Sequence, residues 1–101
     1  MPREPIDAFG QALQRLDQSE KTGATFLITD LDLAMTLANI ARDAAVGSEK
    51  RNRNRANARH AYDAVSRISS HALLTNDERR TVAEKLGELR SALERLGEVF
   101  A

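Results

Sequence analysis

The residues of this chain that could do chemistry are concentrated in one basic stretch, KRNRNRANAR, at residues 50–59. It holds five bases and no acid, whereas the whole chain has 15 Lys and Arg against 15 Asp and Glu and a formal net charge of zero. Because the protein has no net field to steer it onto nucleic acid or an anionic membrane, any cationic site must be local.

A cationic stripe results if this stretch is helical. Arg53, His60 and Arg67 recur every seven residues and project within about 40° of one another on a helix. Together with Arg59 they are our candidate binding residues, for phosphate, RNA or an acidic peptide. The competing interpretation is a solvated ladder of ion pairs, since Glu49–Arg53, Arg59–Asp63 and Asp63–Arg67 each stand four residues apart.

Arg53, Asn54 and His60 resemble the signature of HEPN-type ribonucleases, in which an Arg followed by a polar residue precedes a His. The likeness covers eight residues. It implies an all-helical dimer whose Arg and His meet across a cleft, with His60 as general acid or base and Arg53 stabilising the phosphorane charge. A dimeric ribonuclease is therefore the alternative function.

Other chemistry has little support in the sequence. The chain has no Cys, and His60 and His71 stand eleven residues apart, about 16 Å along a helix, which is too far for one coordination sphere. No Gly-rich phosphate loop occurs, and the paired acids suit helix N-termini. We expect no metal, no cofactor and no enzymatic activity outside the ribonuclease alternative.

Helices must position the candidate residues, because the composition is rich in Ala and Leu and has only 2 Pro and 5 Gly. The apolar segment that starts at Phe26 predicts one helix, with Thr29 or Asp30 as its candidate N-cap and Gly47 as its stop. A second is predicted from about Glu49 to Leu73. The first carries two apolar rows that indicate burial between neighbours, namely Leu33, Leu37, Ile40 and Ala44, and Leu31, Ala34, Ala38, Ala41 and Ala45.

A last helix is predicted to open with a capping box of Thr75 and Glu78. It carries a heptad-like seam that could pack within the chain or against a second copy: Val82, Leu86, Leu89, Leu93, Leu96 and Phe100. Gly87 lies in a row of small residues that predicts a close approach of helix axes.

The N-terminal part is predicted to be separate. Ile6, Phe9, Leu13 and Leu16 form a narrow apolar stripe on a short helix at residues 6–17, and residues 18–25 read as a loop. We therefore divide the chain into an accessory helix with its linker at 1–25 and a bundle at 26–101. Short connections predict an all-α, antiparallel three-helix bundle.

Ala58, Tyr62 and Val65 resemble the second helix of a tetratricopeptide-type pair, and the bundle with its longer third helix is similar to an MIT-type domain. The resemblance implies a protein–protein interaction module that takes a partner peptide or helix in a groove between helices. Our leading hypothesis is thus a non-enzymatic module of this kind, with a protein partner or a second copy of the chain. Nucleic acid is a lesser candidate partner.

Targeting signals are not expected. The N-terminus lacks a basic region followed by an apolar core, and no apolar stretch approaches the ~18 residues of a membrane span. The sequence therefore predicts a cytoplasmic protein without a membrane partner.

Overall fold

The computed structural model describes residues 23–101, which form three helices and no strand. They are α2 (Gly23–Asp43), α3 (Glu49–Ser69) and α4 (Asn76–Arg95). The predicted all-α class and helical bundle are confirmed. The accessory helix predicted at 6–17 and most of its linker lie outside the described residues.

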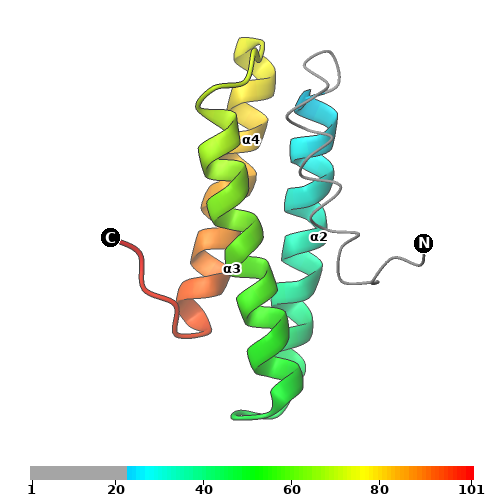
Figure 1. The fold of residues 1–101 in the computed structure, drawn as a ribbon, viewed down its shortest axis with the longest axis vertical. Helices are drawn as coiled ribbons and strands as arrows, with labels where there is room; N and C mark the ends of the chain where they lie inside the picture. The colour runs from blue at the N-terminus through cyan, green and yellow to red at the C-terminus, as the bar shows by residue number, and fades with distance from the viewer. Residues whose placement is uncertain (1–22) are drawn as a thin grey trace, which may run out of the picture.

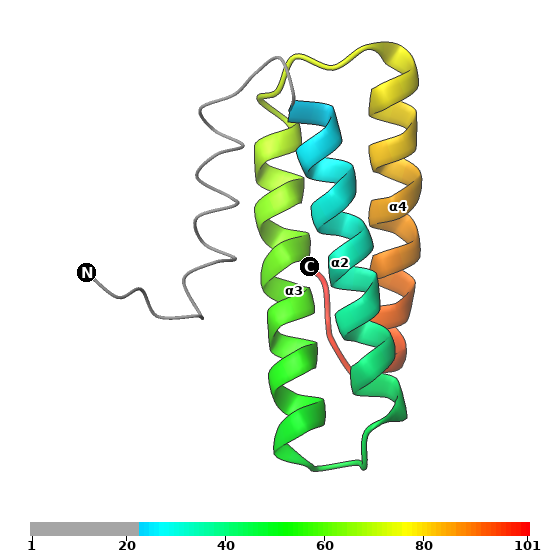
Figure 2. The ribbon, with the colours of Figure 1, turned by 90° about the vertical axis from the view of Figure 1, so that its right-hand side faces the viewer.

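The three helices lie side by side at the corners of a triangle (Figures 1 and 2). In Figure 1 the link after α2 is at the bottom of the bundle and the link after α3 is at the top. The chain leaves α4 at the bottom and turns back upward, and its last residues contact Arg55, Arg59 and Tyr62 of α3. This path brings the C-terminal residues next to the basic half of α3.

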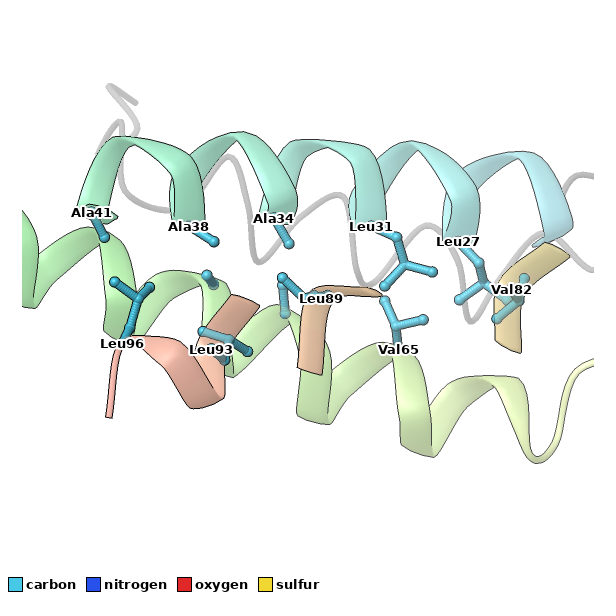
Figure 3. Close-up of a cluster of buried hydrophobic side chains, with 12 residues drawn as sticks. Leu27, Leu31, Ala34, Ala38, Ala41, Val65, Val82, Leu89, Leu93 and Leu96 are labelled. Carbon is cyan, nitrogen blue, oxygen red and sulfur yellow. The ribbon is translucent and has the colours of Figure 1, made fainter. Parts of the chain in front are cut away.

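The core is a column of small and large apolar side chains contributed by all three helices (Figure 3). Leucines of α4, such as Leu89 and Leu93, fill the space opposite alanines of α2, such as Ala34 and Ala38. Burying each Leu stabilises the fold by about 1.5–3 kcal/mol. The heptad-like seam of the last helix therefore packs within the chain.

The first predicted helix is buried on one row only. Leu31, Ala34, Ala38 and Ala41 belong to the core, but Ala45 of the same predicted row lies beyond the helix and is exposed. In the other row Leu33 remains 44% exposed. The prediction that both rows are buried between neighbours is therefore wrong within the described residues, because only α3 and α4 pack against α2 there.

Local signals set most helix ends. The side-chain oxygen of Thr75 accepts a hydrogen bond from the Glu78 amide at 3.1 Å, and the Glu78 carboxylate accepts one from the Thr75 amide at 2.8 Å. This confirms the capping box. Gly47 takes a φ of +81° before the Ser48 cap of α3, a conformation that glycine adopts without a steric penalty.

Three predicted ends are corrected. Helix α2 begins at Gly23, so residues 23–25 belong to the helix and not to the predicted loop, and Thr29 and Asp30 are interior residues and not caps. Helix α3 ends at Ser69 and not at Leu73. Helix α4 ends at Arg95, which leaves Phe100 outside the helix on which its spacing placed it.

Gly87 does not serve a close helix contact. It is exposed, and a Cβ added there would meet nothing within 4 Å. The prediction of close approach at this row is wrong, because the row faces solvent.

Within the described residues, α2 is long and apolar enough to cross a membrane by length and composition alone. Its Leu27 and Leu31 are buried against α3 and α4, as expected for the core helix of a bundle.

Candidate functional site

The candidate residues Arg53, His60 and Arg67 are all exposed on α3. Their spacing of seven puts them on one flank of the helix. Arg53 forms an ion pair with Glu49 at 3.5 Å, as the ladder interpretation predicts. In the described part of the chain no ion pair joins Asp63 to Arg67. The ladder of ion pairs therefore does not include Arg67.

The structure does not bring Arg59 to that flank. Its guanidinium pairs with Asp63 at 3.1 Å and with Glu98 at 3.1 Å, and it donates to the Val99 carbonyl at 2.8 Å. The guanidinium carbon also lies 4.0 Å from the centre of the Phe100 ring. Arg59 thus binds the C-terminal tail of its own chain.

A tight turn after α4 delivers that tail. The Glu98 amide donates to the Leu93 carbonyl and the Gly97 amide donates to the Glu94 carbonyl, both at 3.0 Å, while Gly97 has a φ of +97°. These are the paired hydrogen bonds of a Schellman motif. The motif ends α4 and reverses the chain toward α3.

The tail, which we define as residues 98–101, is held by a second arginine and by aromatic packing. Arg55 donates to the Leu96 carbonyl at 3.2 Å and pairs with Glu98 at 3.4 Å. The Phe100 ring packs edge-on against Tyr62, with ring centres 4.9 Å apart, and the guanidinium carbon of Arg90 of α4 lies 4.9 Å from the centre of the Phe100 ring. Phe100 therefore fills the seam between α3 and α4.

The opposite side of α4 carries an open groove along α2, with a volume of about 410 Å³. Its lining residues are Met35, Asn39, Glu88, Ser91, Ala92 and Arg95. A smaller hollow of about 130 Å³ shares Asn39, Ala92 and Arg95 and adds Arg42 and Arg51. We call the two together the α2–α4 groove. Its floor is partly apolar and its lower end is cationic.

An ion pair also links α2 and α4. Lys85 Nζ lies 2.6 Å from the Asp32 carboxylate, and this hydrogen bond raises the pKa of Lys85.

At the groove's lower end, Arg51 donates long hydrogen bonds of 3.4–3.5 Å to the carbonyls of Ala41, Arg42 and Ala44. These contacts satisfy the open C-terminal end of α2.

One buried carboxyl oxygen of the described residues has no hydrogen-bond partner. Asp30 is 6% exposed, and its Oδ2 accepts no hydrogen bond in the described structure. Burial raises the pKa of this carboxyl, since removal from water disfavours the ionised form.

Sequence reasoning missed the tail contacts and the α2–α4 groove. Gly97, a glycine directly after the last turn of a predicted helix, is the signal for the turn. The groove residues Met35, Asn39 and Arg95 have no distinguishing pattern, because a groove depends on how two helices pack.

Metal ligation has no support from the part of the chain that is described: no group of three or more His, Asp or Glu side chains could hold an ion there. No protein-family model, curated protein or solved structure matches the chain. The tetratricopeptide-like, MIT-like and HEPN-like resemblances stay predictions.

Proposed function

We propose that the protein is a non-enzymatic interaction module that binds a partner peptide in the α2–α4 groove. In this proposal the helices form an antiparallel bundle of the MIT-like kind, with residues 6–17 as an additional short helix. The observation that carries it is the open volume of about 410 Å³ between α2 and α4. The seam between α3 and α4 is already filled by Phe100.

The lining of the groove indicates the chemistry of its partner. Met35 and Ala92 offer an apolar floor, while Asn39 and Ser91 offer hydrogen-bonding groups. Arg95 and Arg42 lie toward the end where the hollow continues. This arrangement favours a peptide that places an apolar side chain between the helices and a carboxylate beside the arginines.

A selection from a displayed random-peptide library on the full-length chain tests the proposal. We expect selected peptides to combine apolar and acidic residues. Ser91→Trp, which fills the groove, should weaken their binding about tenfold or more, whereas the matched variant Ser66→Trp on the exposed face of α3 should not. Absence of saturable binding, or equal binding by both variants, would contradict the proposal.

The ribonuclease alternative has one observation in its favour: Arg53 and His60 are both exposed on the same flank of α3. It requires a symmetric dimer that brings two such flanks together. Sedimentation over a wide concentration range tests the dimer, and an RNA cleavage assay with His60→Ala as the control tests the chemistry. A monomer without cleavage activity would exclude this function.

A further inference from the structure

The incompletely buried apolar row of α2 marks a second surface. Asp32 of α2 pairs with Lys85 of α4, and Met35 and Asn39 of α2 line the groove between the two helices. At about 100° per residue, the row of Phe26, Leu33, Leu37 and Ile40 is turned roughly 140° from them. Figure 2 shows α4 to the right of α2 and α3 to the left, so this row lies on the α3 side.

The cationic stripe of α3 borders the same surface. Tyr62 and Arg59 contact the tail on the α4 side of α3, and Arg53, His60 and Arg67 are on the opposite flank. We call the surface between this stripe and the apolar row the outer α2–α3 face. It combines an apolar floor, where Leu33 is 44% exposed, with a cationic edge.

The chain contains a segment whose length and pattern match this face. Residues 6–17 carry the stripe Ile6, Phe9, Leu13 and Leu16, and as a helix they would span about 17 Å. The apolar row from Phe26 to Ile40 covers about 21 Å. Residues 18–22 reach about 16–18 Å when extended, which suffices to reverse the chain at the start of α2.

The acidic residues of segment 6–17 match the cationic stripe of α3 when the segment runs back along α2. A helix returning along α2 runs parallel to α3, and the flank that bears Asp7 and Asp17 then turns toward α3, while Arg15 points away. The two acids stand about 15 Å apart along such a helix. With Asp17 level with Arg67, Asp7 falls between the heights of His60 and Arg53.

We propose that residues 6–17 dock as an amphipathic helix on the outer α2–α3 face of their own chain, with Asp17 beside Arg67. This helix covers Leu33 and Leu37 and makes the bundle four-helical. This docking shares with the proposed function the short helix at 6–17, but it leaves the α2–α4 groove free and so does not depend on peptide binding there.

Amide hydrogen exchange of the full-length chain tests the docking. We expect residues 6–17 to be protected, and Leu33→Asp to speed their exchange about tenfold or more. Val46→Asp is the matched control, because Val46 is 86% exposed outside this face, and it should leave the protection unchanged. Unprotected residues 6–17 in the wild type, or equal loss in both variants, would overturn the proposal.

A charge exchange tests the orientation. Asp17→Arg and Arg67→Asp should each speed exchange of the segment about two- to fivefold, as expected for an exposed ion pair, and the double variant should restore it. Failure of this rescue would overturn the pairing. Sedimentation of the same samples completes the test: protection confined to a dimer would show that the segment docks on a second copy and contradict docking within one chain.

Discussion

The two sides of α4 differ in what covers them. On the α3 side the tail turns back at Gly97, and Phe100 packs between Tyr62 and Arg90. On the α2 side a groove stays open over Met35 and Asn39. The same helix thus has one seam closed by its own chain and one that is left open. Closure depends on a short tail and on the arginines that hold it, and not on the helices alone.

The largest loss of stability is expected when the ring that closes the α3 side of α4 is removed. Phe100→Ala should lower the free energy of unfolding by about 1.5–3 kcal/mol, less than for a fully buried ring because Phe100 is half-buried. Urea unfolding measures this change. Val99→Ala is the control, since Val99 is 82% exposed and its loss should stay within about 0.5 kcal/mol. Equal effects would show that Phe100 does not close the seam.

The turn that delivers the tail should matter next. Gly97→Ala places a side chain at a φ of +97°, which should cost about 1–2 kcal/mol. The cause is backbone strain, because the new Cβ would have only Arg55 near it, at 3.9 Å. Thermal unfolding checks the loss, and Gly97→Asn should recover part of it. A neutral Gly97→Ala variant would contradict the turn.

Asp30 tests the buried face of α2 by the pH dependence of stability. Since the pKa of its carboxyl is raised in the fold, ionisation destabilises the protein. The effect is absent well below pH 3.8, grows as pH rises from 3.8 through the folded pKa, and is complete above it. Asp30→Asn should therefore raise stability at pH 7 by about 1 kcal/mol and change it less at pH 3.

Urea unfolding of the wild type and Asp30→Asn at both pH values checks this difference. Asp43→Asn serves as the control, because the Asp43 side chain is 71% exposed. A stability difference that does not change with pH would show that the unpaired carboxyl of Asp30 is not its cause.

The smallest change in stability is expected at Gly87, on the solvent-facing side of α4. Gly87→Ala should raise the free energy of unfolding by up to about 1 kcal/mol, because Ala has the higher helix propensity and the added Cβ meets no neighbour. Calorimetry measures the change. A destabilised variant would mean that another segment packs on this row.

The sequence was sufficient to predict features that depend on local patterns. Thr75 and Glu78 identify their capping box by spacing alone, and the row of Leu31, Ala34 and Ala38 identifies the buried stripe of α2. Asp30 was misread as a cap because an acid near a helix start is common. Asp30 stands four residues after Phe26 and three after Leu27, and this helical spacing is the better indication that its side chain is buried.

Other features require the packed structure. Phe100 stands four residues after Leu96 and seven after Leu93, as a heptad pattern requires, yet the helix ends at Arg95 and the chain turns at Gly97 before it. Arg59 is part of the basic run in the sequence, but in the structure its side chain binds the tail. A charge pattern shows which residues are cationic, whereas only the fold shows which of them are already bound.

The central claim is best tested by mapping the selected peptide onto the isotopically labelled, full-length protein through amide chemical shifts. The account predicts that the largest shifts occur at Met35, Asn39, Ser91 and Ala92, while Tyr62 and Arg90 are unaffected. Shifts concentrated at Tyr62, Arg90 and the tail would contradict it, because the partner would then displace Phe100 and bind on the side that we describe as closed.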